Sequence, residues 1–239
     1  EEPLYEGADS PPSLSVPTKE QSEAYEAIDK RLASLREDSK SVDAAAREHA
    51  DARDGLVGEY TFDEPNGILS GDTSGKNHQA RVLLANVAGN ASPERCDTPL
   101  GRGFLFRGGG AITCGEAWEF DISTGISYGA WVKPAPPGGV VISKNSTQPG
   151  SRGFDLLLQE GRAAARIIDH WPDAAIQAIT TTSTTPGEWV HVFVTWDGGS
   201  ESDSVRIFFN GEEQPLEVKN LAGEIKDIGR GHPVLIGCR

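Results

Sequence analysis

The stretch EWVHVFVTW, residues 188–196, decides the fold class because its side chains alternate between two faces. Two sets of residues alternate along it: Val190, Val192 and Val194 on one face, and Trp189, His191 and Phe193 on the other. A period of two residues is typical of a β-strand with one buried face. We therefore interpret His191 as a residue of a sheet face rather than as a ligand.

Runs of the same kind fill the chain from Gly55 to its end, separated by clusters of Gly, Pro, Asn and Ser. They are LVGEYTF (56–62), ARVLL (80–84), GFLFRG (103–108), AITC (111–114), ISYGAWVKP (126–134), GVVISK (139–144), FDLLLQ (154–159), AARIID (164–169), AIQAITTT (175–182), the opening stretch, VRIFFN (205–210) and VLIG (234–237). Asn210-Gly211 is a strong hairpin signal, because both residues tolerate a positive φ. About a dozen short strands predict an all-β sandwich.

The N-terminal quarter has a different pattern. Residues 1–17 mix acids with Pro and Ser and show no periodicity, which predicts an extended or disordered linker. Residues 18–54 predict one helix of roughly 50 Å that ends at Gly55. Its narrow apolar stripe consists of Tyr25, Ile28, Leu32, Leu35, Val42, Ala46 and His49.

The helix stripe has two interpretations. It is either the partner surface of a coiled coil or a structural helix that docks on its own domain or on upstream sequence. Fewer than four clean heptads are present and Ser39 interrupts the seam, which favours the structural helix.

Composition and charge exclude several classes of function. The net charge of −14 over 239 residues, without a cluster of Lys and Arg, argues against a nucleic-acid partner. The sequence contains no run of about 18 apolar residues, so membrane insertion is not predicted. The N-terminus lacks the features of a signal peptide. The absence of Met suggests a piece of a longer precursor. Cys96, Cys114 and Cys238 are an odd number and leave the disulfide state open.

The order of the motifs from Gly55 to the end carries a resemblance to a known superfamily. GLVGEYTFDE, DTSGKNHQA, GRGFLFRGGGAITC, ISYGAWVKPA, GEWVHVFVTWDG, VRIFFNGE and PVLIG follow one another as they do in laminin-G-like, concanavalin A-like domains. The resemblance implies a jelly-roll β-sandwich of two antiparallel sheets over residues 55–239, preceded by a helical extension.

ARIIDHWPDAAIQAIT and WDGGSESDSVRIFFNGEEQPLEV together resemble a narrower group, the module embedded in secreted planctomycete-type proteins that also carry a c-type cytochrome domain. This implies a bacterial module that is secreted, periplasmic or at the cell surface and works next to other domains. Its implied role is non-catalytic, as a recognition or spacer module, and carbohydrate is the ligand usually presumed for such modules. The haem motif CxxCH is absent from this chain, so no haem is expected in it. The superfamily usually ends with a further strand, whereas this chain stops at Arg239, so we expect a missing or replaced closing strand and an open sheet edge.

Glycoside hydrolases of the same fold set a test for enzymatic activity. They require two carboxylates about 5–5.5 Å apart for retention of configuration, typically on alternate residues of one strand. The acids of these enzymes typically follow the pattern Glu-x-Asp-x-x-Glu or Glu-x-Asp-x-Glu. WEFDIS supplies Glu119 and Asp121, but Ser123 and Thr124 occupy the two positions where the last Glu of either pattern would stand. We therefore expect no enzymatic activity.

The loop DTSGKNHQA, residues 72–80, resembles a loop that relatives place near calcium. Oxygen ligands from Asp72 and Asn77 suit Ca²⁺, and Gly75 permits the tight turn. The alternative is an Asx-type turn without metal, which is favoured because the further carboxylate that relatives recruit from the closing strand is absent.

The stretch DHWPDAAIQ, residues 169–177, is the candidate ligand site. Trp171 precedes Pro172 and is expected to be extended, which ends the preceding strand at a corner. An exposed Trp171 would stack on a sugar ring, and the polar partners would be Asp169, His170, Asp173, Arg166 and Arg152. A buried Trp171 would cap the sandwich instead. The sequence thus predicts a carbohydrate-binding module, with a structural spacer or docking domain as the alternative and a glycoside hydrolase as a more distant one.

Overall fold

The computed structural model describes residues 18–48, 53, 55–84, 91–115, 124–145, 152–228 and 231–237. The chain divides into two units, residues 1–56 and residues 57–239. The first unit contains one described helix, and the second contains all the described strands.

Helix α1 (Lys19–Glu48) begins where a capping box closes its first turn. The amide of Gln21 donates to the Thr18 hydroxyl at 3.3 Å, and the amide of Thr18 donates to Oε1 of Gln21 at 2.9 Å. This reciprocal pair satisfies two amides that a helix start otherwise leaves without partners. Among the described residues no helix is long and apolar enough to cross a membrane.

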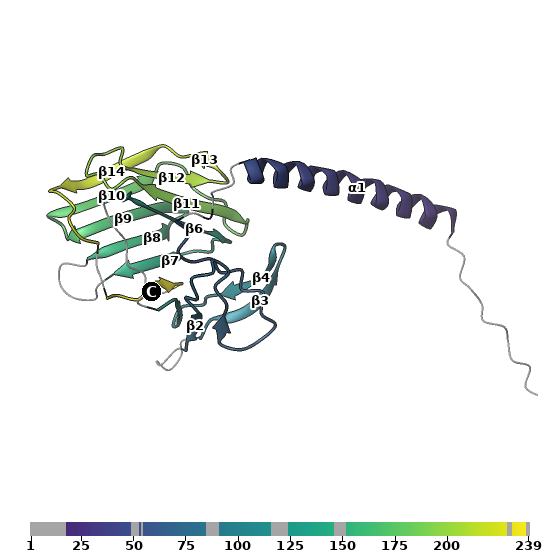
Figure 1. The fold of residues 1–239 in the computed structure, drawn as a ribbon, viewed down its shortest axis with the longest axis horizontal. Helices are drawn as coiled ribbons and strands as arrows, with labels where there is room; N and C mark the ends of the chain where they lie inside the picture. The colour runs from purple at the N-terminus through teal and green to yellow at the C-terminus, as the bar shows by residue number, and fades with distance from the viewer. Residues whose placement is uncertain are drawn as a thin grey trace, which may run out of the picture. The chain divides into compact units, whose positions relative to one another are not determined.

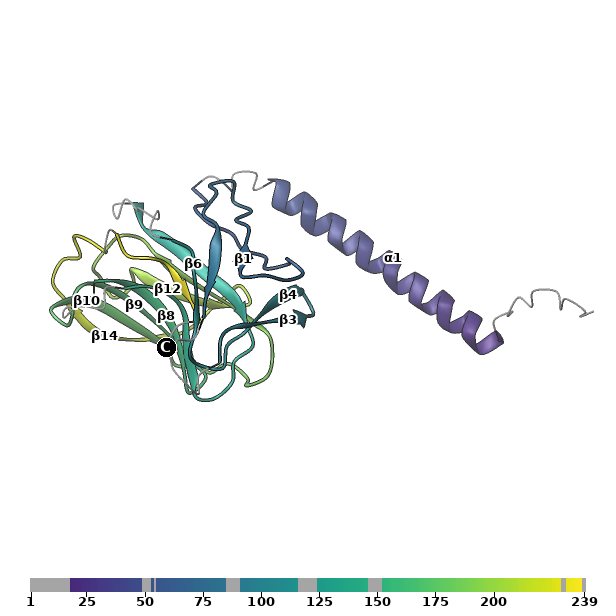
Figure 2. The same cartoon turned by 90° about the horizontal axis from the view of Figure 1, so that it is seen from below.

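The second unit is a sandwich of two antiparallel sheets with a small hairpin (Figures 1 and 2). In the described part of the chain, the larger sheet runs in the order β1 (Leu69–Ser70), β2 (Ala80–Leu83), β5 (Ala111–Thr113), β15 (Leu235–Ile236), β7 (Gly138–Asn145), β8 (Gly153–Gln159), β9 (Arg162–His170), β10 (Ala174–Thr180) and β14 (Leu216–Ala222). The smaller sheet runs in the order β13 (Glu212–Glu213), β12 (Val205–Phe209), β11 (Val190–Trp196) and β6 (Ile126–Val132). The hairpin pairs β3 (Glu94–Thr98) with β4 (Gly101–Leu105).

The core lies between the inner faces of the two sheets. Val192 and Val194 of β11 are fully buried in one hydrophobic cluster with Leu156 of β8 and Ile167 of β9. The alternation of residues 188–196 therefore predicted the buried face of β11 correctly. The predicted hairpin is also confirmed, because Asn210 and Gly211 have positive φ angles and connect β12 to β13. The predicted jelly-roll sandwich is the observed fold class.

Residues 56–62 do not form the strand that the sequence predicted. The aromatic rings of Tyr60 and Phe62 instead pack against the core, and Phe62 has a φ of 61° that breaks an extended run. The spacing of apolar residues predicted a strand here, but an irregular segment that packs two aromatic rings against the core can have the same spacing.

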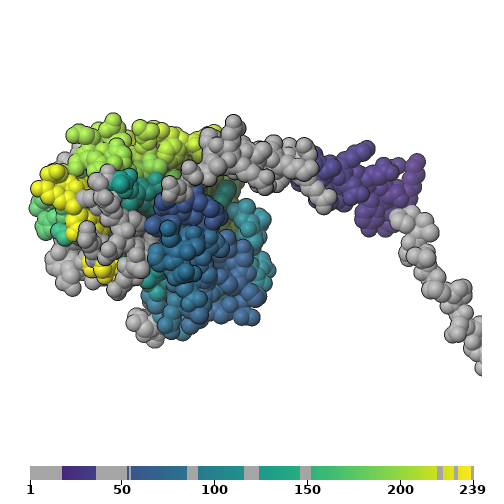
Figure 3. Space-filling view, in the orientation of Figure 1, coloured from purple at the N-terminus to yellow at the C-terminus, as the bar shows by residue number. Residues whose placement is uncertain are grey.

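Arg95 of β3 holds that irregular segment. Its guanidinium donates to the carbonyls of Phe62, Gly67 and Leu69 at 2.9, 3.2 and 2.8 Å, and to the hydroxyl of Ser70 at 2.8 Å. It also pairs with Oε2 of Glu64 at 3.2 Å. On the face shown in Figure 3, the blue part of the chain that includes this segment forms one continuous block of surface.

Strands β1, β3, β13 and β14 were not predicted from the sequence. The largest of them, β14, pairs with β10 at the edge of the larger sheet. Its alternation of Leu216 and Val218 with Glu217 and Lys219 is a strand signal that was present in the sequence. At the other end of the chain, β15 lies between β5 and β7 inside the sheet, not at an edge.

Candidate functional site

The predicted corner connects β9 to β10. His170 pairs with Ala174 across the turn, and the register of the two strands shifts between Ala174 and Ala175. The peptide bond between Trp171 and Pro172 is cis. His170 and Asp173 are exposed and Trp171 is half-buried. The preceding strand, β9, thus ends at the corner as expected.

A buried ion pair lies beside this corner, on the face of the larger sheet that points away from the core. Asp155 of β8 and Arg166 of β9 are direct cross-strand partners. The Arg166 Nε lies 2.9 and 3.1 Å from the two carboxylate oxygens of Asp155, and its Nη2 donates to Oδ2 as well. The Asp155 side chain is 1% exposed and that of Arg166 is 29% exposed. Asp155 therefore holds Arg166 in place, while part of the Arg166 side chain stays exposed to solvent.

Two further groups complete the surroundings of this pair. The amide nitrogen of Asn145 donates to Oδ2 of Asp155 at 2.6 Å. The Arg166 guanidinium carbon lies 6.0 Å from the centre of the Trp171 ring, near the outer limit of a cation–π contact. Hydrogen bonding to Asp155 is the largest cause that raises the pKa of Arg166, so its positive charge is secure.

Arg152 and Asp169, two other predicted ligand residues, bind each other and a neighbouring segment. Arg152 Nη2 lies 2.9 Å from Oδ1 of Asp169, and its Nη1 lies 3.0 Å from Oδ2 of Asp227. The amide of Lys226 donates to the other oxygen of Asp169 at 2.9 Å. These contacts tie the corner to residues 226–227, which favours a packing role for Arg152 and Asp169.

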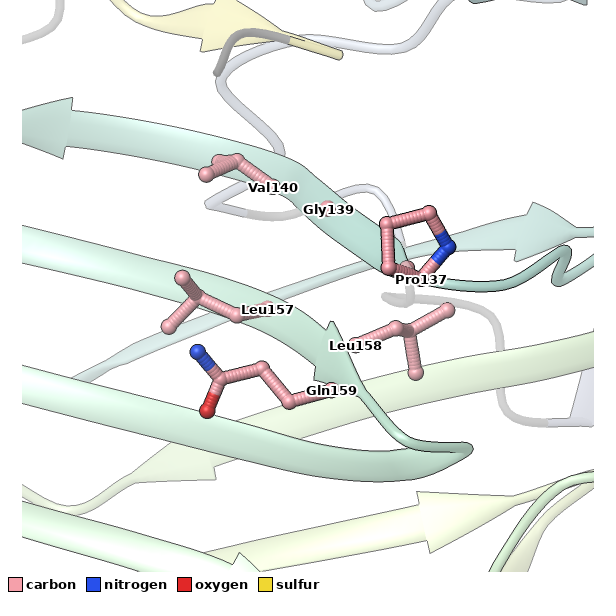
Figure 4. A pocket seen from close by; sticks show the side chains of 7 residues that line it. Pro137, Gly139, Val140, Leu157, Leu158 and Gln159 are labelled. Atoms are coloured by element: carbon pink, nitrogen blue, oxygen red, sulfur yellow. The ribbon is translucent and has the colours of Figure 1, made fainter.

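A hollow of about 250 Å³ lies between the start of β7 and the end of β8 (Figure 4). It is lined by Pro137, Gly138, Gly139, Val140, Leu157, Leu158 and Gln159. A Cβ added at Gly139 would meet no atom within 4 Å, whereas at Gly138, where φ is +94°, it would collide with the Leu158 carbonyl. Gly139 thus leaves space beside its backbone at the wall of the hollow, whereas Gly138 packs closely against the Leu158 backbone.

The hollow and the ion pair share one face of the larger sheet. Leu157 and Asp155 are two residues apart on β8, so their side chains point to the same side, about 7 Å apart along the strand. We call the surface formed by Leu157, Asp155, Arg166 and Trp171 the outer sheet face.

The loop proposed for calcium is held by hydrogen bonds to Asp72. Its Oδ1 accepts from the amides of Glu59 and Ser74 at 3.1 and 2.9 Å, and its Oδ2 accepts from the amide of His78 at 2.9 Å. Desolvation alone would raise the pKa of Asp72, but these hydrogen bonds outweigh it and lower the pKa to about 2. These contacts of Asp72 are of the kind found in an Asx-type turn, the alternative to a calcium site. Asn77 has a φ of 62°, as a turn requires.

Glu119 and Asp121, the two carboxylates considered for a hydrolase site, lie outside the described residues. Within the described ranges, no group of three or more His, Cys, Asp or Glu side chains is placed to hold a metal ion. Cys96 is a free thiol, and burial raises the pKa of the Cys114 thiol to about 12.

The smaller sheet presents an aromatic row that the sequence did not single out as a site. Trp131 of β6 is 50% exposed, and its ring lies 5.3 Å from that of His191, which lies 5.7 Å from that of Phe193. His191 was expected on a sheet face, and the row occupies the face of this sheet that points away from the core. In contrast, Trp196 is buried in the core. A search for aromatics on the polar side of an alternating strand would have found the row.

Comparison with solved structures shows only remote similarity. One is the binding domain of botulinum neurotoxin DC in complex with SialylT, at 14% identity and a TM-score of 0.48, covering 77% of this chain and 44% of that chain. Another is the botulinum neurotoxin serotype D binding domain, at 17% identity and a TM-score of 0.48, covering 73% and 42%. A third is domain 4 of an extracellular GH43 arabinanase from Geobacillus stearothermophilus in complex with arabinotriose, at 16% identity and a TM-score of 0.44, covering 70% and 77%. The chain thus spans less than half of the toxin chains that it matches.

No curated protein matches the sequence. A family model does match, over residues 106–239, which is more than half of the chain and includes the strands from β5 to β15. On this match and on the observed sandwich, the chain belongs to the concanavalin A-like lectin/glucanases superfamily.

Proposed function

We propose that this chain is a non-catalytic carbohydrate-binding module whose site is the outer sheet face. The observation that supports this most is the placement of Arg166. A fully buried carboxylate fixes its guanidinium, an aromatic ring flanks it, and part of it remains exposed to solvent.

This placement suits the recognition of sugar hydroxyls. Asp155 occupies Nε and Nη2 of Arg166 and so limits the rotation of the guanidinium. A donor that is already oriented loses little conformational entropy when a ligand binds. The Trp171 ring supplies the apolar surface on which the C–H face of a sugar ring packs, and the exposed His170 supplies a further polar group at the rim.

The hollow extends the site along β8. Leu157 gives it an apolar wall, and Gln159 gives it an amide that both donates and accepts. Mostly apolar concave surfaces with a few polar groups are typical of small-ligand sites. A glycan of more than one unit could therefore contact Arg166 and the hollow together.

A binding role without catalysis is part of the proposal. The carboxylates of Asp155 and Asp169 are each committed to an arginine, so neither is placed as the acid or nucleophile of a glycosidase. We further propose that the module acts outside the cell within a longer secreted protein, on the resemblance of its motifs to such proteins. Fold alone does not establish any of this, because one fold hosts many functions.

A glycan array probed with the wild-type chain and with Trp171→Ala tests the proposal. We expect the wild type to bind at least one glycan and Trp171→Ala to lose at least about tenfold in affinity, because the aromatic wall is removed. Trp131→Ala is the matched control, since it removes a half-exposed indole from the other sheet. Repeating each measurement with a chelator tests the calcium prediction for Asp72 and Asn77.

Two results would count against this site. Binding that is lost in Trp131→Ala and kept in Trp171→Ala would move the site to the smaller sheet. A folded wild-type chain that binds no glycan would leave the corner as packing and favour the structural alternative.

A further inference from the structure

Helix α1 carries an exposed apolar stripe, Tyr25, Ile28, Leu32 and Leu35, which we call the α1 stripe. Their exposed fractions are 63%, 55%, 43% and 47%. Spacings of three and four residues are those of heptad positions a and d, with Tyr25 and Leu32 at a. The helix has 30 residues, about 45 Å, and such a narrow stripe is usually stabilised by a partner helix.

The charges beside the stripe indicate what that partner is. In the heptad that the stripe defines, two pairs of oppositely charged residues flank it: Asp29 and Arg36 at e, and Arg31 and Asp38 at g. Charges at e and g set the partner and the orientation of paired helices.

A parallel pair of α1 helices would be repelled by these charges. In a parallel pair, position g of one helix meets position e of the next heptad of the other. Arg31 would then meet Arg36, and Asp38 would meet Asp43. Like charges at such positions are destabilising.

An antiparallel pair would be attracted by the same charges. In an antiparallel pair, e meets e and g meets g, so Asp29 faces Arg36 of the second copy and Arg31 faces Asp38 of the second copy. Each contact occurs twice because the pair is two-fold symmetric. In this register Leu32 faces Leu35, and Lys19 faces Glu48, so the two helices overlap over their whole length.

The charges at positions e and g also favour one register of the antiparallel pair over its neighbours. Sliding the antiparallel pair by one heptad in one direction sets Arg31 against its own copy and Asp29 against its own copy. Sliding it in the other direction does the same for Arg36 and Asp38. Only the full-length register brings opposite charges together at all four positions.

Ser39 interrupts the apolar seam, but the exposure of the α1 stripe and the charges beside it favour a partner helix over a structural role. We propose that α1 is a self-association helix, which pairs antiparallel with α1 of a second copy of this chain. The pair covers both α1 stripes, and its dimer presents two sandwich domains. Two linked copies of a weak binding domain gain avidity for a ligand with repeated units. The dimer does not depend on the carbohydrate proposal, since it uses none of the residues of the outer sheet face.

Sedimentation equilibrium of the full chain, from micromolar to submillimolar concentration, tests the pairing. We expect a concentration-dependent dimer that Leu32→Asp abolishes. Arg36→Asp distinguishes the two orientations, because it sets Asp against Asp29 in the antiparallel pair but against Arg31 in a parallel pair. We expect Arg36→Asp to weaken the dimer about tenfold, and Asp29→Arg combined with Arg36→Asp to restore it.

Lys30→Asp is the matched control, since it changes the net charge equally at the outward position f. It should leave the dissociation constant within about twofold. A wild-type chain that stays monomeric throughout would overturn the proposal and favour a partner on another polypeptide. A dimer that Arg36→Asp strengthens, or that Leu32→Asp leaves unchanged, would overturn it as well.

Discussion

Arg95 and Arg166 are both arginines on strands of the same unit, and they differ in how many of their donors the protein uses. Arg95 is 10% exposed, binds five acceptors and lies with its guanidinium carbon 4.6 Å from the Phe104 ring centre. Arg166 binds one carboxylate and keeps 29% of its side chain exposed. A guanidinium whose donors are all used, such as that of Arg95, serves as a structural clamp, whereas one bound to a single carboxylate can also bind a ligand.

The largest expected effect is the loss of stability when Arg95 is replaced. Arg95→Ala leaves three carbonyls and the Glu64 carboxylate without their shared donor, so we expect it to lower the free energy of unfolding by about 3–5 kcal/mol. Urea unfolding measures this loss. Arg107→Ala is the control, because that side chain is 59% exposed and should change stability by less than about 1 kcal/mol. Equal effects of the two substitutions would contradict the description of Arg95 as a clamp.

The next effect separates the two roles of Arg166. Arg166→Leu leaves the buried Asp155 carboxylate without its cation, although the side-chain amide of Asn145 still donates to it. The substitution should lower the free energy of unfolding by about 2–4 kcal/mol. Adding Asp155→Asn removes the uncompensated charge and should recover part of that loss. The two free energies, measured by urea unfolding, form half of a double-mutant cycle. No recovery in the double variant would mean that the charge of Asp155 is not the cause.

The smallest expected effect is a pH dependence of the free energy of unfolding, caused by the hydrogen-bonded carboxylate of Asp72. The folded pKa of Asp72 is lowered to about 2, so its ionised form stabilises the fold. The stability that distinguishes the wild type from Asp72→Asn should be fully present above about pH 4 and should be lost as pH falls through about 2. Unfolding free energies of both chains at several pH values measure this difference. A difference that does not vary with pH would show that the hydrogen bonds from Glu59, Ser74 and His78 do not favour the charged form.

Much of the fold could be predicted from the sequence because the strand signal is local. Each buried strand face shows as a period of two in consecutive residues, as Val190, Val192 and Val194 do in β11. The turn at Asn210-Gly211 and the capping box at Thr18 and Gln21 are local as well. Short strands such as β1 and β13, with two residues each, carry too little pattern to be predicted.

The candidate site could be predicted only in part. The sequence placed Trp171, His170 and Arg166 near one another, because the corner and the end of β9 are a few residues apart. It did not reveal Asp155, which is 11 residues from Arg166 and meets it only through the register of β8 with β9. It also did not separate Arg152, which is committed to two aspartates, from Arg166, because composition does not show which donors are already used.

The sequence by itself determined the class of fold, the existence of α1 with its stripe and charges, and the position of the corner, because periodicity, capping and turn chemistry act over a few neighbouring residues. Only the tertiary structure decided which polar groups are saturated. For example, the carbonyl and hydroxyl groups that accept hydrogen bonds from Arg95 lie 25 to 33 residues away from it along the chain. Trp131 is exposed because β6 is an edge strand and its ring lies on the outer face of its sheet. Such contacts depend on strand register and sheet order, which no short stretch of sequence contains.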